Sequence, residues 1–249
     1  MGRGPMLTKI NIILAVLLWA STCFSQVTIG AGGISISGFS TGGTAATPAY
    51  LVSEDFEGAG YENSWTESGG GTIDEDYTTT VLVGSQSLGI VNASGQTTNY
   101  AYTNYTAQDN TYVYLRFRTN TLSVQREIVN ILDSSNNSLC LVQAISTNDI
   151  RATTGGGSVA TVGMITNNVE YHFWVRYSKG TGSNGVCSVG FSTDGTEPTS
   201  GDNFVSKTNS TSTAQGSRLF LGGYANSTSI LRIYDKIRVL ETSIGSNPQ

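Results

Sequence analysis

Two short stretches, Leu51-Val-Ser-Glu-Asp-Phe-Glu-Gly58 and Leu231-Arg-Ile-Tyr-Asp-Lys-Ile-Arg-Val239, decide the fold of this 249-residue chain. In both, apolar and polar residues alternate, which is typical of strands with one buried face. Both also carry carboxylates inside the strand pattern, where carboxylates are uncommon. We interpret them as the first and last strands of one domain, paired so that the ends of the domain meet.

The sequence between these two stretches is also β-like. No segment has a sustained helical period, and short alternating runs recur between turns rich in Gly, Asn, Ser and Thr. This pattern predicts one all-β sandwich of two antiparallel sheets over residues 50–241, followed by a C-terminal tail at 242–249. The clearest runs are 51–57, 86–92, 99–105, 112–119, 127–133, 138–146, 149–153, 170–178, 186–192, 218–223 and 231–240.

The N-terminal 25 residues have the form of a signal peptide. Arg3 and Lys9 precede an apolar run at residues 10–20, and small and polar residues then favour cleavage between Ser25 and Gln26. We therefore expect a secreted, extracellular or periplasmic protein that does not insert into a membrane after cleavage. The alternatives are a retained anchor at the cell surface and a lipoprotein that begins at Cys23.

Residues 26–49 are rich in Gly, Ser and Thr, which predicts a flexible linker. The alternation in Val27-Thr-Ile29 and in Ile34-Ser-Ile36 leaves an extra edge strand as the alternative.

Composition argues against a nucleic-acid partner. Loss of Arg3 and Lys9 with the signal leaves 11 basic against 18 acidic residues, a net charge of −7. A partner with a phosphate backbone needs a basic patch. Only 12% of residues are charged and 12 are tyrosine, which suits an exported β-sandwich with a neutral, hydroxyl-rich surface.

Two cysteines remain after cleavage, Cys140 and Cys187, each in an apolar strand-like run. In an exported protein they could form a disulfide, or they could be two small buried apolar residues. The sequence leaves both alternatives open.

The order and spacing of four segments resemble the concanavalin A-like lectin/glucanase superfamily, whose jelly roll includes the laminin G-like domains. They are Glu54-Asp-Phe-Glu-Gly58 followed by Trp65, Gly84-Ser-Gln-Ser-Leu88, Tyr171-His-Phe-Trp-Val-Arg-Tyr177 and Tyr234-Asp-Lys-Ile-Arg-Val239. The resemblance implies two stacked curved sheets, with a ligand groove on the concave one.

Strand parity predicts which side chains would line that groove. Val113, Leu115 and Phe117, like Phe173 and Val175, should face the core. The opposite faces of the same two strands, together with Gln143, make up our predicted glycan face: Tyr112, Tyr114, Arg116, Arg118, Gln143, His172, Trp174 and Arg176. Aromatic rings stack on sugars and arginines bond hydroxyls or carboxylates, so we expect a polysaccharide or glycoconjugate partner. The alternative is an ordinary exposed sheet face.

Catalysis is not our first expectation. A retaining glycosidase needs two carboxylates about 5–5.5 Å apart, and no strand carries such a pair. Glu127 and Asp133 lie six residues apart, hence roughly 20 Å along a strand, and Asp74-Glu-Asp76 is predicted to be a solvated loop. We therefore expect a non-catalytic carbohydrate-binding or adhesive module with no catalytic residues. A polysaccharide lyase or glycoside hydrolase and a structural surface or particle protein are the alternatives.

The resemblance also implies a structural Ca²⁺ near the paired first and last strands. Its ligands would be the side chains of Asp235 and Glu57 and backbone carbonyls at Gly58 and Gly84. The alternative is that Asp235 pairs with Lys236, Arg238 or Arg232.

Overall fold

The computed structural model describes residues 26–30, 33–37, 49–58, 60–92, 98–120, 125–145, 147–157, 159–210, 213–225 and 230–242. The predicted signal peptide and nearly all of the predicted tail lie outside these residues. The described part of the chain contains strands and no helix, so it includes no helix that could span a membrane.

The strands follow one another in short steps along the chain. They are β1 (Gln26–Gly30), β2 (Gly33–Ser37), β3 (Val52–Glu54), β4 (Trp65–Gly69), β5 (Thr72–Tyr77), β6 (Ser87–Asn92), β7 (Thr98–Gln108), β8 (Asn110–Thr119), β9 (Arg126–Leu132), β10 (Ser138–Ala144), β11 (Asp149–Thr154), β12 (Val159–Met164), β13 (Tyr171–Ser178), β14 (Gly185–Ser192), β15 (Phe204–Ser210), β16 (Gly216–Tyr224) and β17 (Ile230–Leu240).

The chain divides after Pro48 into two units. In the first, β1 and β2 pair with each other as an antiparallel hairpin. This hairpin lies inside the segment that we expected to be a linker, where two strand-like alternations left a strand as the alternative.

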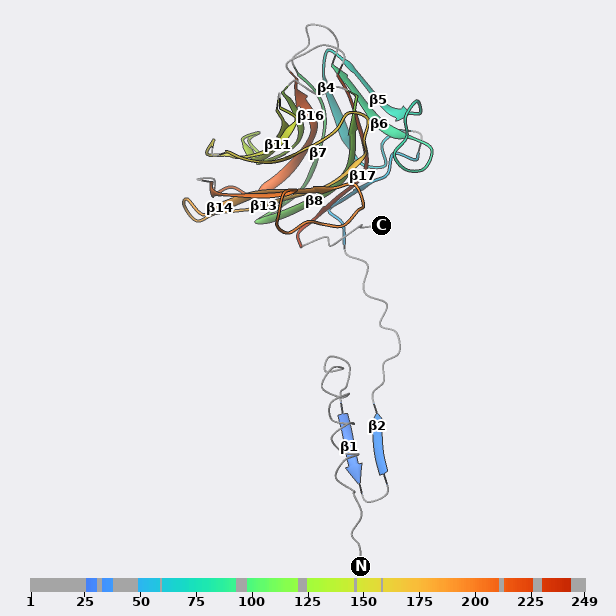
Figure 1. Cartoon of the computed structure of the whole chain (residues 1–249), viewed down its shortest axis with the longest axis vertical. Helices are drawn as coiled ribbons and strands as arrows, with labels where there is room; N and C mark the ends of the chain where they lie inside the picture. The colour runs from blue at the N-terminus through green and yellow to red at the C-terminus, as the bar shows by residue number, and fades with distance from the viewer. Residues whose placement is uncertain are drawn as a thin grey trace, which may run out of the picture. The chain divides into compact units, whose positions relative to one another are not determined.

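The second unit is a sandwich of two antiparallel sheets, which confirms the predicted fold class. The eight-stranded sheet has the order β15-β14-β13-β8-β17-β6-β5, with β3 beside β17. The seven-stranded sheet has the order β12-β11-β10-β9-β16-β7-β4. Figure 1 shows the eight-stranded sheet curving from β14 and β8 up to β6 and β5, with the seven-stranded sheet on the inside of this curve. The free face of the seven-stranded sheet is therefore the concave one.

The core fills the space between the sheets. Val113, Leu115 and Phe117 of β8 and Phe173 and Val175 of β13 are all buried in it, as strand parity predicted. A disulfide between Cys140 of β10 and Cys187 of β14 joins the two sheets across this core.

The two stretches that open our sequence analysis do pair. Residues Val52 to Glu54 lie antiparallel to Ile237–Val239, and the Leu51 amide donates a hydrogen bond to the Val239 carbonyl at 2.7 Å. A register shift between Asp235 and Arg238 interrupts the pairing of β17 with β8, and Lys236 lies at this bulge with φ of 50°. We call this region, where β3, β17 and residues 82–87 meet, the seam.

Sequence patterning did not identify every strand. The pattern left out β4, β12 and β15, and the interpretation of Asp74-Glu-Asp76 as a loop was wrong, because these residues lie in β5. Each of these four strands is an edge strand of one of the two sheets. Edge strands are covered less by neighbours and so depart most from a clean alternation.

Candidate functional site

The strands that carry most of the predicted glycan face are neighbours, but they lie in the eight-stranded sheet and not in the sheet whose free face is concave, where the groove was expected. β8 and β13 pair with His172 opposite Arg116, Trp174 opposite Tyr114, and Arg176 opposite Tyr112. All of these side chains lie on the outer face of the eight-stranded sheet, away from the core.

The centre of that outer face is covered. The exposed fraction is 1% for Tyr114, 3% for Trp174 and 8% for His172. Part of the cover is the loop after β14, because a Cβ on Gly190, which pairs with Trp174, would lie 2.9 Å from the Pro198 carbonyl. Rings that a sugar could stack on are therefore not available at the centre of this face.

Charges at the rim of the covered face are also paired. Arg116 forms an ion pair with Glu170, and Arg176 forms one with Glu197 while it lies over the Tyr112 ring at 5.6 Å. Four of the predicted residues, Tyr112, Arg116, Arg118 and Arg176, stay half-buried around the rim. Their role in glycan binding remains a prediction.

The Tyr114 hydroxyl and Nδ1 of His172 are 2.6 Å apart beneath this cover. Burial lowers the pKa of His172, with a contribution from the nearby Arg116, and burial raises the pKa of Tyr114 to about 12. Both groups are therefore neutral at pH 7, and their contact is a hydrogen bond between uncharged partners.

Gln143 does not belong to this face. It lies in β10 of the seven-stranded sheet, where it pairs with Arg151 on one side and Glu127 on the other. Its inclusion with residues of β8 and β13 was wrong, because the sequence does not show to which sheet each strand belongs.

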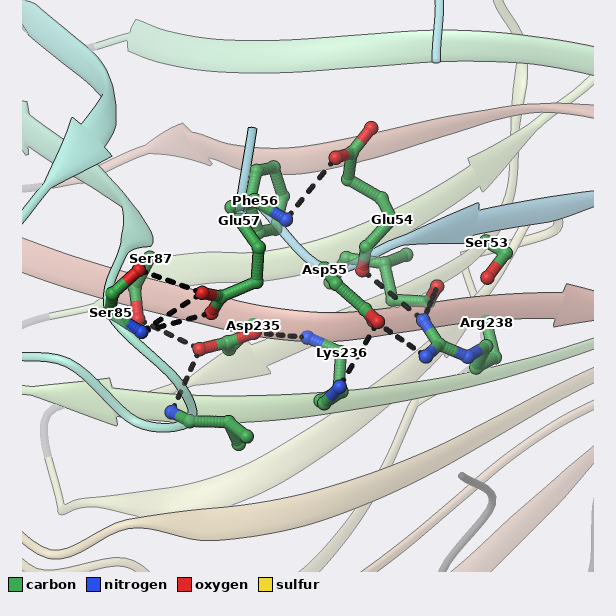
Figure 2. Close-up of polar contacts among 12 residues, drawn as sticks. Ser53, Glu54, Asp55, Phe56, Glu57, Ser85, Ser87, Asp235, Lys236 and Arg238 are labelled. Carbon is green, nitrogen blue, oxygen red and sulfur yellow. Dashed lines mark hydrogen bonds and ion pairs between the residues drawn. The ribbon is translucent and has the colours of Figure 1, made fainter. Parts of the chain in front are cut away.

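The seam carries the residues predicted to bind calcium (Figure 2). The carboxylate of Asp235 accepts hydrogen bonds from the Val83 amide at 2.9 Å, the Ser87 hydroxyl at 2.8 Å and the Lys236 amide at 2.7 Å. Both oxygens of Glu57 accept from the Ser85 amide, at 3.2 and 3.0 Å, and the Ser85 hydroxyl donates to one of them at 2.8 Å.

These contacts do not fit a Ca²⁺ site. A calcium site gathers oxygen ligands with free lone pairs, whereas here amide and hydroxyl donors already surround each carboxylate. An ammonium group is also present, because Lys236 Nζ lies 3.0 Å from Asp55, which Arg238 approaches from the other side at 2.5 Å. Among the described residues, no cluster of three or more His, Cys, Asp or Glu side chains could hold a metal ion.

The two glycines of the calcium prediction also have other roles. Gly84 has φ of 67°, and a Cβ there would come within 1.9 Å of the Glu57 carboxylate, so glycine allows Glu57 to reach Ser85. The Gly58 carbonyl accepts from the side-chain amide of Gln86 at 2.9 Å once that amide is oriented to donate. The seam therefore holds Asp235 by hydrogen bonds from Val83, Ser87 and the Lys236 amide. The side chains of Lys236 and Arg238, two of its alternative partners, pair with Asp55 instead.

A different face of the sandwich carries accessible aromatic rings. On the concave face of the seven-stranded sheet, Phe220 of β16 stacks on Tyr100 and Tyr102 of β7, with ring centroids 4.5 and 5.0 Å apart. All three rings are half-buried. Arg218 lies over the Tyr102 ring at 5.3 Å and donates to the Asn104 side chain at 2.6 Å. We call Tyr100, Tyr102 and Phe220 the aromatic platform.

A set of polar residues lies farther across the same face. Glu127 of β9 and Gln143 of β10 lie opposite each other, and their side chains are hydrogen-bonded. Glu127 also accepts from the Tyr224 amide at 3.0 Å. Arg151 of β11 pairs with Gln143, and its Nε is buried with no hydrogen-bond partner. We call Glu127, Gln143, Arg151 and Tyr224 the polar cluster.

The acid of the polar cluster, Glu127, has a perturbed pKa. Burial raises the pKa of Glu127, although the Tyr224 amide, Arg232 and Gln143 all oppose the shift. The Glu127 carboxylate is half-buried, so it is both perturbed and reachable from the concave face. Chemically, the face offers ring surfaces for stacking at one end, and donors, a cation and a titratable acid at the other.

Sequence reasoning did not assign the platform or most of the cluster to a site. Tyr100 and Tyr102 alternate with smaller residues in the run 99–105, but no signal in the sequence places β7 beside β16 on the concave sheet. Phe220 stands between two apolar residues, Leu219 and Leu221, which hides its outward position. Tyr102 and Phe220 pair across 118 positions of sequence. Local periodicity does not reveal such a pairing.

No protein-family profile and no curated protein matches the chain. Solved structures do match it. A glucuronan lyase from the fungus Trichoderma reesei has a TM-score of 0.55 at 13% identity, over 81% of this chain and 99% of the other. Cellulose induced protein Cip1 has a TM-score of 0.59 at 13% identity, over 79% and 100%. A botulinum neurotoxin type C structure, described in connection with ganglioside interaction, has a TM-score of 0.55 at 11% identity, over 78% and 48%. These likenesses confirm the predicted jelly-roll fold.

Proposed function

We propose that this concanavalin A-like jelly roll is an exported carbohydrate-binding module that holds a glycan chain along its concave face. The observation that carries the proposal is the aromatic platform, because three half-buried rings on two adjacent strands offer an apolar surface for pyranose rings. Arg218, Asn104 and the polar cluster supply hydrogen-bond partners for hydroxyl or carboxylate groups beside it.

The proposed compartment has support from the disulfide between Cys140 and Cys187. Disulfides persist in oxidising compartments and are rare in the cytosol. This agrees with export by the predicted signal peptide. The structural neighbours include a glucuronan lyase and a botulinum neurotoxin described in connection with ganglioside interaction, which supports a glycan-related role.

The test is binding to acidic and neutral polysaccharides by affinity electrophoresis and on a glycan array. We expect Phe220→Ala to weaken binding at least tenfold, because it removes the middle ring of the platform. Tyr112→Ala is the matched control, since it removes a half-buried ring from the outer face of the other sheet. Loss of binding in Tyr112→Ala with full binding in Phe220→Ala would contradict the proposal and place the site on the predicted glycan face of β8 and β13.

A second candidate is a polysaccharide lyase that uses the same face, and the polar cluster favours it. A lyase removes the proton beside the uronate carboxyl group, breaks the bond to the leaving oxygen, protonates that oxygen and leaves a carbon–carbon double bond. Arg151 and Gln143 could bind the substrate carboxylate. Glu127, whose burial raises its pKa, could exchange a proton.

The unsaturated product absorbs ultraviolet light, so its release from glucuronan-like and alginate-like polymers tests the lyase. We expect Glu127→Gln to abolish any such activity while polysaccharide binding persists. Binding without release of absorbing product from the unmodified protein would leave the non-catalytic module as the function.

A further inference from the structure

Arg232 of β17 joins the two sheets beneath the concave face. It is fully buried, and its position in the strand directs it between the sheets, since Tyr234 two residues later packs in the core. Its Nη1 donates to the carbonyl oxygens of Glu127 at 3.0 Å and Gly223 at 3.3 Å. Its Nη2 donates to the carbonyl oxygen of Asn99 at 3.1 Å and to the side-chain oxygen of Asn92.

The aromatic platform and the polar cluster together form the concave-face site, and the three backbone carbonyls belong to β7, β9 and β16, three of the five strands that carry it. Asn99 precedes Tyr100 in β7, Glu127 is itself in the polar cluster, and Gly223 precedes Tyr224 in β16. One rigid guanidinium on the eight-stranded sheet therefore fixes three strands of the opposite sheet at the level of the site. Arginine suits this role because its planar fork presents several donors at set angles.

The backbone at this level departs from ordinary strand geometry at two places. Gly222 and Gly223 have φ of 83° and 124°, and the register of β9 against β10 shifts next to Gln143. A Cβ on Gly222 would lie 3.4 Å from the Arg232 guanidinium carbon, and one on Gly223 would lie 2.0 Å from the Glu127 carboxylate. The two glycines thus fit between Arg232 below and Glu127 above.

The groups that act on the pKa of Glu127 are Arg232, the Gln143 side chain and the Tyr224 amide, and Glu127 in turn acts on the pKa of the buried Tyr234 hydroxyl. Arg232 is a fully buried guanidinium among these groups. Burying a cation without a full counter-charge costs stability. A positioning role in the site would account for the burial of Arg232.

We propose that Arg232 is the positioning residue of the concave-face site, which sets the places of Glu127, Tyr224 and Tyr100 from beneath the sheet. The part of this inference that concerns glycan binding rests on the proposed function. Its geometric part concerns this chain alone and can be tested without any glycan.

The test compares Arg232→Met with Arg238→Met in the full chain. Arg238 is the matched control, because it is also a buried arginine of β17 that donates to backbone carbonyls, those of Glu54 and Ile237, but it lies at the seam. The first readout is the pKa of the Glu127 carboxyl group, which is measured by carbon NMR. The second is hydrogen exchange of the Tyr224 amide, which donates to Glu127. The third is polysaccharide affinity.

In Arg232→Met we expect the pKa of Glu127 to rise further, because a nearby cation that favours the carboxylate is gone. We also expect faster Tyr224 exchange and about tenfold weaker binding. Arg238→Met should leave all three unchanged while it lowers the melting temperature. Arg232→Lys, which keeps the charge and loses the fork, should speed Tyr224 exchange with a smaller change in the Glu127 titration.

An unchanged Glu127 titration and unchanged Tyr224 exchange in Arg232→Met would overturn the inference, as would equal effects in Arg238→Met. If Arg232→Met does not fold, Arg232→Lys decides by the Tyr224 exchange. If the unmodified protein binds no polysaccharide, the proposed function fails, and the first two readouts still decide the role of Arg232.

Discussion

Buried carboxylates of this protein are held by hydrogen-bond donors of the chain itself. Glu54 is fully buried, yet it accepts from the amides of Phe56, Glu62 and Asn63 and from the side chains of Asn63 and Trp65. Donors in this number replace the water that a buried carboxylate loses. This explains why acidic residues stand inside the strand-like stretch 51–58, and it does so without a metal.

Asp235 gives a prediction at the same scale. Burial raises its pKa to about 6, although hydrogen bonds from Ser87, Val83 and Lys236 oppose the shift. Because the folded state binds the proton more tightly than the unfolded chain, Asp235 stabilises the fold less as pH rises from about 4 to about 6. We expect the free energy of unfolding, relative to Asp235→Asn, to fall over this range by up to about 3 kcal/mol.

Urea unfolding of both proteins at several pH values would measure this difference. Ser87→Ala should shift the transition to higher pH, because it removes a hydrogen bond that favours the ionised carboxylate. A difference that rises with pH, or that does not change between pH 4 and 6, would contradict the prediction.

At the scale of the elements, Lys236 and Arg238 of β17 both form ion pairs with Asp55 and so join the two sides of the seam. Burial works to raise the pKa of Asp55, but the hydrogen bonds from these two cations outweigh it and hold that pKa below its usual value. We expect the melting temperature to be the same in EDTA and in millimolar Ca²⁺. A rise with Ca²⁺ that EDTA reverses would show a bound ion.

The disulfide between β10 and β14 is the other link between elements. It joins residues 47 positions apart in the sequence, and closing a loop of that length stabilises a fold by about 4 kcal/mol in the chain-entropy treatment. We expect the double variant Cys140→Ala/Cys187→Ala to lose several kcal/mol of unfolding free energy. Calorimetry of the oxidised protein, its reduced form and the double variant would measure this. Equal stability of all three would contradict the prediction.

At the scale of the whole molecule, the sandwich holds its core and both candidate faces within residues 49–242. A chain that begins at residue 49 should therefore fold with a melting temperature within about 3 °C of the chain that begins at Gln26. Thermal unfolding followed by circular dichroism would compare the two. A drop much larger than this would show that the segment before residue 49 stabilises the sandwich.

Local pattern predicted much of the fold because strand alternation is a local property. The core positions of β8 and β13 follow from a period of two, and the pairing of β3 with β17 follows from two matching stretches at the ends of the domain. The local pattern did not predict edge strands such as β5 and β12, because their side chains have less to pack against.

The sequence by itself determined the class of fold and the core-facing side of its clearest strands, since these depend on neighbours a few residues apart. Only the tertiary structure decided which sheet is concave, that Tyr114, His172 and Trp174 are covered, and that Phe220 meets Tyr100 and Tyr102. It also decided that donors and Lys236 surround the carboxylates of the seam. These facts depend on strand order and on loops packed over sheets, which bring together residues more than 100 positions apart.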